Sequence, residues 1–371
     1  MKVAYFIGSL NRGGTETLVL DTFRHREALP YDPVLIYRND GNLSEDYRST
    51  GVPMIRIKPR GFKPAYVFRL RSALKREKVD ILHTQTLLNA FLGLFCVAFT
   101  RIRLVASFHG LHTSLRMRVF AHLVIWFADA SVFVSEYVRK WYLQHTLLAS
   151  GKRCHVVYNG IDWSKLDQDR PAPDFLGPAE TTGGPSDVKL AMVGSFVGGR
   201  SQRFVCQSLA RLRDNGMDNF QFFFVGRRSE AESERYDECV RFCEGHGLMD
   251  KVHFLGERKD VPAILQHIDG FVYASVHDTF GIAVVEAIAA GVPVVVNDWE
   301  VMKDITDNGR WAILYKTGDV DSCAKVLAEL LADPARFKAP AQEHASEIRN
   351  RFGIERHIRG LSDVYGTVCR V

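Results

Sequence analysis

Short apolar runs alternate with longer amphipathic stretches along most of the chain. The runs are rich in β-branched and aromatic residues, as in strands buried within a sheet. In the first half they are KVAYFIG, DPVLIYR, VPMIRI, VDILHT, RLVASFHG, ASVFVS and CHVVYNG. Residues 65–78, between two such runs, carry an apolar stripe at helical spacing, made of Tyr66, Leu70, Ala73 and Leu74. This alternation predicts an α/β protein with parallel sheets covered by helices.

Residues 167–187 interrupt the pattern. They read DQDRPAPDFLGPAETTGGPSD, rich in Pro, Gly and acidic residues without an apolar period, which is typical of a linker. The alternation then resumes with VKLAMVGSF, FQFFFVG, KVHFLG, GFVYAS and PVVVN. We therefore predict two doubly wound, Rossmann-like domains facing each other across a cleft. Their bounds are 1–166, with a C-terminal helix 352–371 able to pack back on it, and 188–351. Ligands of such sheets bind at the carboxyl ends of the strands.

Composition adds few constraints. The chain has 371 residues, 46% of them hydrophobic and 25% charged, and a net charge of +5, which by itself indicates no partner. Its seven cysteines show no paired metal-binding pattern, and the spacing of Cys239 and Cys243 fits one helix face. We interpret all seven as reduced thiols of a cytoplasmic protein. The N-terminus does not resemble a signal peptide, and the most lipid-like run, residues 87–100, is too short to span a bilayer.

One carboxylate, Glu286, stands out in the otherwise apolar stretch 280–290, which is predicted to be a helix closed by Gly291 and Pro293. A charged side chain is rarely buried without a partner, so either this helix has a wet edge or Glu286 binds a ligand. Asp278 precedes the helix, where it would cap the first turn or contact a ligand. Eight helical residues span roughly 12 Å. That distance suits a diphosphate flanked by a ribose at Glu286 and a sugar at Asp278, with the helix N-terminus facing the phosphates.

Two glycine-rich turns follow predicted strands. Gly13 and Gly14 either form a plain tight turn or let backbone N–H groups approach an anion. In the second domain, VGSFVGGRSQRF places Arg200 near the start of a helix. Its guanidinium is either a solvated surface group or a phosphate ligand. Neither turn has the spacing of a dinucleotide-binding fingerprint.

The stretch HDTFGIAVVEAIAAGVPVVV resembles the signature of glycosyltransferase family 4, which comprises retaining enzymes of GT-B architecture. Further matches occur in the expected order along nearly the whole chain: GGTE (13–16), DILHTQ (80–85), FHG (108–110), VVYNGID (156–162) and KVHFLGERKDV (251–261). Each match is weak alone, but the ordered set is specific. The resemblance implies transfer of a sugar from a nucleotide diphosphate to a saccharide hydroxyl.

The resemblance also implies roles for individual residues. It makes His109, Asp278 and Glu286 the catalytic set, with Glu286 on the nucleotide ribose and His109 beside the transferred sugar. Donor-binding roles pass to Gly13, Gly14, Ser195, Arg200, Arg258, Thr279, Phe280, Gly281 and Glu286. Arg200 occupies the position of a phosphate-binding lysine, Gly14 faces the diphosphate, and Phe280 and Gly281 offer backbone donors.

Two positions depart from the family pattern. Asp278 replaces a glutamate, and Ser195 stands where an arginine is common. One phosphate contact is therefore either missing or supplied elsewhere, by Arg227 or Arg228. On general grounds a histidine that ends a strand is structural more often than catalytic. The predicted position of His109 favours a site role, whereas His83 is interpreted as scaffold.

No metal and no cofactor are expected. The sequences DQD (167–169) and DVD (319–321) have the Asp-x-Asp pattern with which some sugar-transfer folds bind a divalent cation. Because the first lies in the linker and the second opens a late helix, both are interpreted as solvated carboxylates. Arg200 and a helix N-terminus would neutralise the leaving diphosphate instead. The expected co-substrate is a nucleotide sugar, with a UDP-sugar favoured over a GDP-sugar.

The acceptor is expected to be a saccharide, including a polyprenyl-linked one, in surface polysaccharide or glycan synthesis. Residues 56–78 contain nine Lys or Arg and one Glu, which fits either a solvated helix face or an anionic membrane surface that would hold the protein peripherally on the cytoplasmic side. No nucleic-acid recognition module is recognisable. The alternatives are a catalytically silent relative acting as a partner subunit, and a two-domain epimerase or phosphorylase.

Overall fold

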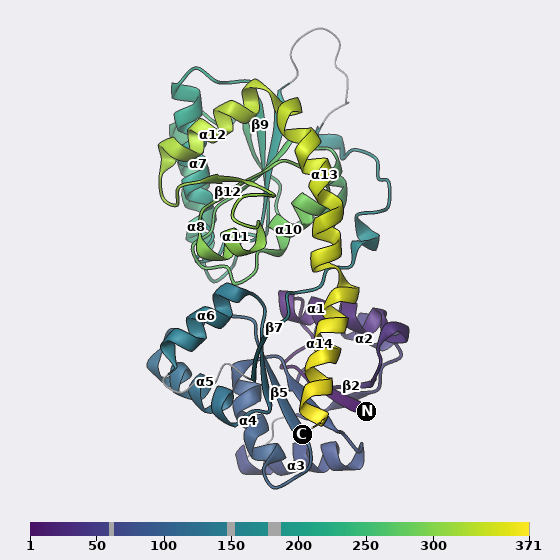
Figure 1. The fold of residues 1–371 in the computed structure, drawn as a ribbon. Coiled ribbons are helices and arrows are strands. Elements are labelled where there is room, and N and C mark those ends of the chain that lie inside the picture. Colours follow the sequence, from purple (N-terminus) through teal and green to yellow (C-terminus); the bar gives the residue numbers. More distant parts are fainter. Residues whose placement is uncertain (59–62, 147–152, 177–186, 371) are drawn as a thin grey trace. The chain divides into compact units, whose positions relative to one another are not determined.

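The computed structural model describes residues 1–58, 63–146, 153–176 and 187–370. It divides into two compact units, of which unit 1 comprises Met1–Asp162 and Phe352–Val371 and unit 2 comprises Trp163–Arg351 (Figure 1). The C-terminal helix predicted over 352–371 thus belongs with the first half of the chain. Ten of the 21 residues of the predicted linker, 177–186, lie outside the described residues.

Unit 1 is built on a sheet whose described strands follow the order β3-β2-β1-β4-β5-β6-β7, with every pairing parallel. This is the doubly wound order with helices on both faces. The strands are β1 (Lys2–Phe6), β2 (Asp32–Tyr37), β3 (Met54–Arg56), β4 (Ile81–Thr84), β5 (Arg103–Phe108), β6 (Ala130–Phe133) and β7 (Cys154–Val156). Each of the seven runs predicted from the first half of the sequence contains one of them.

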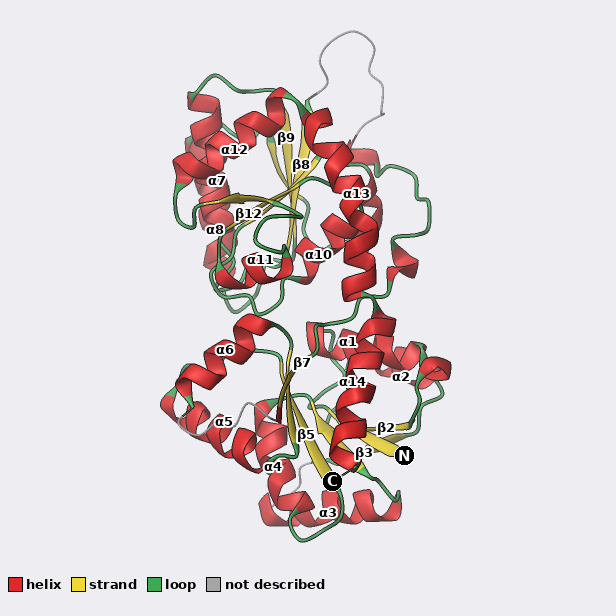
Figure 2. Ribbon diagram, viewed as in Figure 1, coloured by secondary structure: helices red, strands yellow, loops and turns green. Residues whose placement is uncertain are grey.

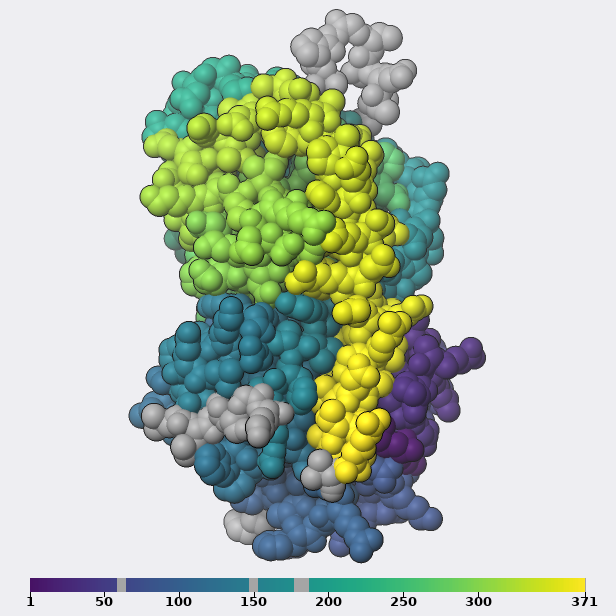
Figure 3. Space-filling model, in the orientation of Figure 1, coloured from purple at the N-terminus to yellow at the C-terminus, as the bar shows by residue number. Residues whose placement is uncertain are grey.

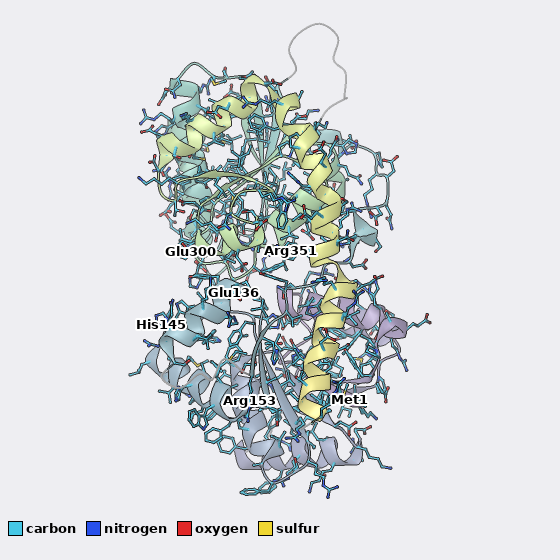
Figure 4. The ribbon with its side chains drawn as sticks, viewed as in Figure 1. Met1, Glu136, His145, Arg153, Glu300 and Arg351 are labelled. Carbon is cyan, nitrogen blue, oxygen red and sulfur yellow. The ribbon has the colours of Figure 1, made fainter. Side chains whose placement is uncertain are left out.

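The helices of unit 1 follow the strands in turn (Figure 2). They are α1 (Gly14–Arg24), the 3-10 turn η1 (Arg26–Ala28), α2 (Ser44–Ser49), α3 (Lys63–Arg76), α4 (Leu87–Val97), α5 (Leu115–Phe127), α6 (Glu136–His145) and α14 (Ile354–Cys369). Glu136 and His145 mark the two ends of α6 in Figure 4. The predicted stripe on α3 is confirmed, because Tyr66, Leu70, Ala73 and Leu74 are all buried.

Unit 2 repeats the architecture with the strand order β10-β9-β8-β11-β12-β13, again parallel throughout its described part. Its strands are β8 (Val188–Val193), β9 (Phe220–Val225), β10 (Val252–Phe254), β11 (Gly270–Tyr273), β12 (Val294–Asn297) and β13 (Ile313–Tyr315). The last of these was not predicted. Its helices and turns are η3 (Trp163–Lys165), η4 (Asp174–Leu176), α7 (Gln202–Asp214), α8 (Ser233–Gly245), α9 (Val261–Gln266), α10 (Ile282–Ala289), α11 (Glu300–Ile305), α12 (Val320–Ala332) and α13 (Pro334–Phe352).

The cysteines are free thiols, as predicted. Cys239 and Cys243 lie on one buried face of α8, and their sulfurs contact that of Cys206 on α7. This spacing serves helix packing rather than metal binding.

Helix α14 is part of the core of unit 1, and Figure 3 shows it packed against the N-terminal segments of that unit. Its residues Leu361, Val364, Tyr365 and Val368 are buried in one cluster with β1 and β2. At its other end Gly160 allows close approach, since a Cβ there would lie 2.6 Å from the His357 Cβ. The sulfur of Cys369 lies 3.6 Å from that of Met1, which Figure 4 labels beside the end of the helix.

A buried hydrogen-bond network also holds α14 to the sheet. The Tyr365 hydroxyl lies 2.6 Å from His83 Nδ1 and 3.1 Å from the Tyr5 hydroxyl. His83 Nε2 lies 2.7 Å from the Ser107 hydroxyl, so both ring nitrogens of His83 have partners within the protein. This arrangement supports the interpretation of His83 as scaffold. His357 Nδ1 donates to the backbone oxygen of Tyr158 at 2.8 Å.

Acid should therefore destabilise unit 1. Burial lowers the pKa of His357 to about 4 and that of His83 well below its usual value, whereas an unfolded chain takes up protons near pH 6.5. The stabilisation is complete above pH 6.5 and is lost as the pH falls toward 4, by about 1.4 kcal/mol per pH unit for each histidine. Hydrogen exchange of the β1 amides between pH 7 and 5 measures this free energy. His357→Gln should reduce the pH dependence of this free energy by the contribution of one histidine, about 1.4 kcal/mol per pH unit.

The exposed histidine His246, the C-cap residue of α8, provides the control. His246→Gln should leave the pH dependence of β1 protection unchanged. An equal slope in wild type and His357→Gln would contradict the assignment of this acid sensitivity to His357.

Candidate functional site

In unit 2, three loops come together at the carboxyl ends of adjacent strands. Strands β8, β11 and β12 are neighbours in the sheet, so the segments that follow them share one edge. The loops contact each other through the backbone: Ser201 N–H donates to Ala274 O at 3.0 Å, and Val276 N–H donates to Gly199 O at 2.9 Å. This edge contains most of the residues predicted to bind a donor.

The central polar group is the buried hydroxyl of Tyr273, at the end of β11. It donates to Asp278 Oδ2 at 2.6 Å and also makes a hydrogen bond with the Arg200 guanidinium. Burial, followed by the charge of Asp278, raises the Tyr273 pKa, so the phenol keeps its proton and remains a donor. The structure thus brings together Arg200 and Asp278, 78 positions apart in sequence, through a tyrosine that sequence analysis missed.

Close packing explains the glycines around Arg200. A Cβ on Gly194 would lie 2.7 Å from an Arg200 terminal nitrogen, and one on Gly199 would lie 2.3 Å from the His277 Cβ. Gly199 also has φ +90°, a backbone conformation that favours glycine. Ser195 is half-buried, and its backbone oxygen accepts from Arg200 at 3.4 Å and from Gln202 at 3.1 Å. Gly194 therefore leaves room for the Arg200 side chain, and Gly199 leaves room for His277.

Asn297 fixes the loop that carries Asp278. Its Nδ2 donates to Ser275 O at 2.8 Å and to the Thr317 hydroxyl at 3.0 Å, while its Oδ1 accepts from Ser275 N at 3.1 Å. Asn297 is 2% exposed, so it acts inside the protein. Its position as the polar last residue of the apolar run PVVVN is the sequence signal for this role.

The turn before α10 differs from the prediction. The helix begins at Ile282 rather than near Phe280, and its N-cap is Gly281, with φ +79° and no capping side chain. Asp278 is consequently not the N-cap, because its carboxylate accepts from Tyr273 instead. The 12 Å helical separation expected between Asp278 and Glu286 is also wrong, since only part of that segment is helical. Thr279 is half-buried, and Phe280, 2% exposed, anchors the turn in the core.

Glu286 lies in the middle of α10 on a partly exposed edge of the helix, between the buried Val285 and Ala287. It makes interactions within the chain. A carboxylate in this apolar stretch had two possible explanations, a solvent-exposed helix edge or a bound ligand. The structure shows the solvent-exposed edge. A ligand is not needed to account for Glu286, although one can still bind to it.

Two other arginines have partners of their own. Arg258 forms two hydrogen bonds with Asp260, at 2.7 and 2.6 Å, and lies 4.8 Å from the ring centre of Phe175. The ion pair lowers the pKa of Asp260. Arg228 likewise pairs with Asp237, at 2.7 and 3.0 Å. Both guanidinium groups thus have carboxylate partners outside the group formed by Arg200, Tyr273 and Asp278, which we call the Arg200 cluster. Arg227 is exposed, and its backbone oxygen accepts from Phe196 N at 3.0 Å beside Ser195.

In unit 1, Gly13 and Gly14 form the start of α1. Gly13 is the N-cap in an extended conformation, so the pair does not serve a left-handed turn. A Cβ on Gly13 would lie 2.5 Å from the Glu16 carboxylate, which therefore sits close to the first turn. Partial burial raises the pKa of Glu16. Any second anion at this helix end would lie near the Glu16 carboxylate.

His109 directly follows β5 at the carboxyl edge of the unit 1 sheet and is half-buried. Its Nε2 lies 2.9 Å from Gln85 Oε1. Burial, assisted by the nearby His357, lowers the His109 pKa to about 3, so the imidazole is neutral at physiological pH. As the Gln85 oxygen can only accept, Nε2 carries the proton.

A cavity of about 10 Å³ lies beside this histidine, lined among others by His83, Gln85, His109, Asn159 and His357. Within the described residues, Gln85 Nε2 and Asn159 Oδ1 are buried without a protein partner. The size and polarity of the space suit one water molecule.

The two acidic triplets have structural roles. Asp319 caps α12 by accepting from Ser322 N at 2.9 Å, and Asp321 pairs with Arg211 at 2.8 Å. Asp167 forms an ion pair with Arg349. Over the described part of the chain, no three His, Cys, Asp or Glu side chains are grouped as a metal site would require.

Part of the basic segment 56–78 can also be placed. Lys75, Arg76 and Lys78 are exposed near the end of α3, whereas residues 59–62 lie outside the described residues. Among the helices that the structure describes, none has the length and apolar character to cross a bilayer.

Comparison with known proteins identifies the family. The profile described as Glycosyltransferase Family 4 matches residues 12–165, and that described as Glycosyl transferases group 1 matches residues 187–333. The two matches correspond to the two sheets.

Individual similar proteins are consistent with this family. The UDP-Gal:alpha-D-GlcNAc-diphosphoundecaprenol alpha-1,3-galactosyltransferase of Escherichia coli is 22% identical over 309 residues, 80% of this chain and 77% of that one. The phosphatidyl-myo-inositol mannosyltransferase of Mycobacterium leprae is 26% identical over 277 residues, 73% and 69% of the two chains. The structure of Anabaena HepE in complex with UDP and glucose has the same fold, with a TM-score of 0.84 and 18% identity over 99% of this chain and 100% of that chain. The chain therefore belongs to glycosyltransferase family 4 and has the Rossmann-like domains of the GT-B fold.

Proposed function

We propose that this glycosyltransferase moves a sugar from a UDP-sugar to a hydroxyl of a saccharide acceptor, with retention of configuration and without a metal. The observation that carries the proposal is the convergence of Arg200, Tyr273 and Asp278 at the carboxyl edge of the unit 2 sheet, beside the start of α10. In a member of this family, that edge is the natural place for the donor.

The donor diphosphate would lie between Arg200 and the N-terminus of α10. That terminus has no side-chain cap, and its N–H groups carry the positive end of the helix dipole. Arg200 adds a full positive charge and the bidentate geometry that phosphate favours. Phe280 and Gly281 would contribute backbone donors, with Thr279 and Ser195 beside them. The UDP complex of HepE supports the choice of a uridine nucleotide.

Glu286 is assigned to the nucleotide ribose, and Asp278 to hydroxyl groups of the transferred sugar. One Asp278 oxygen accepts from Tyr273, which orients the carboxylate and leaves the other oxygen for a second bond. In unit 1, Gly13 and Gly14 are assigned to the diphosphate and the neutral His109 to the transferred sugar. Arg258 is the weakest member of the set, because Asp260 already occupies its guanidinium.

The proposed reaction proceeds on one face of the sugar. The bond between the anomeric carbon and the diphosphate oxygen breaks, and its electron pair leaves with UDP. The acceptor oxygen forms the new bond on the same face, while its proton passes to the departing diphosphate. Arg200 and the α10 N-terminus stabilise the charge that develops on the leaving group. The protein residues supply positioning and electrostatics, without a covalent intermediate.

Unit 2 is proposed as the donor domain and unit 1 as the acceptor domain. The relative that acts on a diphosphoundecaprenol-linked saccharide supports a polyprenyl-linked acceptor in surface polysaccharide synthesis. With such a substrate, the protein would work on the cytoplasmic face of a membrane, with the basic segment 56–78 toward the lipid phosphates.

A catalytically silent relative is the second candidate, favoured by Asp278 and Ser195 at positions where the family pattern has Glu and Arg. Such a protein would bind a donor or partner without turnover. Incubation with UDP-sugars and a polyprenyl-diphosphate-linked saccharide, with UDP release as the readout, separates the two candidates. Donor binding without UDP release would favour the silent relative.

Thermal stabilisation by UDP, GDP, ADP and their sugars tests the donor site. A ligand that binds only the folded protein raises its melting temperature, and we expect UDP and UDP-sugars to give the largest shift. Glu286→Gln should abolish most of this shift, because the amide lacks the charge that strengthens hydrogen bonds from ribose hydroxyls. The exposed Glu257 is the matched control, and Glu257→Gln should retain the full shift.

A lower melting temperature for Glu286→Gln with an intact UDP shift would mean that Glu286 is purely structural. The ribose assignment would then be wrong.

Substitutions in the Arg200 cluster should separate donor binding from turnover. Arg200→Gln should weaken UDP binding roughly tenfold or more, because a charge-assisted hydrogen bond contributes about 1.5–3 kcal/mol. Tyr273→Phe should lower kcat at least tenfold, since it removes the donor that orients Asp278. It should change UDP affinity less than threefold, because Arg200 keeps its charge and its hydrogen bond to the Ser195 backbone oxygen. Isothermal titration and steady-state kinetics measure both effects. Arg241→Gln, which affects only an exposed pair with Glu234, is the control.

A further inference from the structure

Large apolar side chains are exposed on one part of unit 1. Of the eleven large hydrophobic residues exposed in the described chain, eight belong to α3, α4, α5 or the residue Phe99 just after α4. Six of them define what we call the α4–α5 ridge: Phe95 (54% exposed), Phe99 (103%), Leu115 (77%), Val119 (49%), Trp126 (47%) and Phe127 (63%).

The ridge is continuous because the two helices pack together. Helices α4 and α5 both follow strands of one parallel sheet and lie side by side (Figure 1). The rings of Phe91 and Phe120 stack across their interface at 4.1 Å, and Phe91 contacts Phe95 at 5.4 Å. Each helix thus buries one apolar stripe against the sheet and presents a second one outward.

A second apolar stripe is unusual for a helix that covers a sheet. Helix α4, LLNAFLGLFCV, contains no charged residue, although its side chains Leu88 and Phe95 are exposed. Helices that are apolar on all sides are normally buried in protein or in lipid. Contiguous apolar surface on a folded protein usually marks an interaction site.

Charge indicates what covers the ridge. The 48 residues from Ile81 to Ala128 contain no Asp or Glu. Exposed basic residues lie on the neighbouring helix α3, just after α4 and on α5, and they are Arg69, Lys75, Arg76, Arg101 and Arg116. An apolar surface edged with arginine and lysine matches the interface of an anionic bilayer, with acyl chains below and phosphates at the rim. A second copy of the chain would bring two basic rims together and is disfavoured.

We propose that the α4–α5 ridge inserts into the interface of a membrane containing anionic phospholipids. The aromatic side chains of Phe95, Trp126 and Phe127 would enter the boundary between headgroups and acyl chains, and the basic residues would lie at the phosphates. The membrane-binding part of unit 1 is then an apolar ridge on α4 and α5, and the cations near α3 form its rim.

One end of the ridge lies on the side of unit 1 where a lipid-linked acceptor would be needed, and in this respect the inference rests on the proposed function. Helices α4 and α5 begin after the carboxyl ends of β4 and β5, the edge of the sheet at which His109 lies. Leu115, the first residue of α5, belongs to the ridge at that edge. Phe95, Phe99, Trp126 and Phe127 lie near the C-terminal ends of α4 and α5, toward the opposite edge of the sheet. A saccharide carried on a membrane lipid would therefore approach His109 along α5, past the Leu115 end of the ridge.

Co-sedimentation of the full chain with vesicles tests the inference. We expect binding to phosphatidylcholine vesicles containing about 30% phosphatidylglycerol and at least tenfold weaker partitioning for Phe95→Ser/Phe127→Ser. Arg101→Glu/Arg116→Glu should reduce binding to the anionic vesicles and make the remainder less sensitive to salt. Met249→Ser, which replaces an exposed apolar residue of unit 2, should bind like wild type. Brominated acyl chains should quench the fluorescence of wild type more than that of Trp126→Phe.

Three results would overturn the inference: no binding to anionic vesicles, equal binding by Phe95→Ser/Phe127→Ser, or a self-association that the double substitution abolishes while vesicle binding persists. The thermal shift with UDP keeps this test separate from the proposed function. Ridge variants should retain that shift, because the donor residues of unit 2 are unchanged. Loss of vesicle binding with an intact UDP shift refutes membrane docking alone, whereas vesicle binding without any UDP shift or turnover refutes the glycosyltransferase proposal alone.

Discussion

The parallel sheet is the constraint on which the rest of this structure depends. Parallel strands need a crossover between each pair, and here helices supply most of the crossovers and cover both faces. Both units obey this rule, with strand orders that reverse beside β1 and β8. All strands of a unit then end at the same edge. Polar residues that cannot enter the buried strands collect in the loops there, and in this chain the site residues do so.

In unit 2 that edge concentrates charge around a single buried hydroxyl. Tyr273 receives a hydrogen bond from a cation, Arg200, and gives one to an anion, Asp278. Such a relay holds both side chains in defined positions while the phenol remains neutral. Asn297 secures the loop from the neighbouring strand, and the glycines at 194 and 199 leave room for the arginine and for His277. Electrostatic preorganisation of this kind is what departure of a diphosphate requires.

Unit 1 combines a rigid interior with an unusual surface. The return of α14 buries Tyr365 against Tyr5 and His83, so that the C-terminal residues complete the core of the N-terminal sheet. His109 lies next to this network, and burial keeps its imidazole neutral. On the outside, α4 and α5 expose aromatic side chains in a segment without acidic residues. A core stabilised in this way can tolerate an apolar exterior that serves binding rather than folding.

The sequence by itself determined the α/β class, all seven strands of the first sheet and five of the six described strands of the second, because buried parallel strands leave runs of apolar residues. It also pointed to the turns with Arg200 and Asp278, since glycines and charges between such runs are local signals. Only the tertiary structure decided which of these residues meet. The contact of Tyr273 with Asp278 and Arg200, the start of α10 at Ile282 and the pairing of Arg258 with Asp260 all depend on packing in space. The sequence also did not reveal that one side of α4 is exposed, because an apolar helix has the same sequence pattern whether its outer face contacts protein, lipid or water.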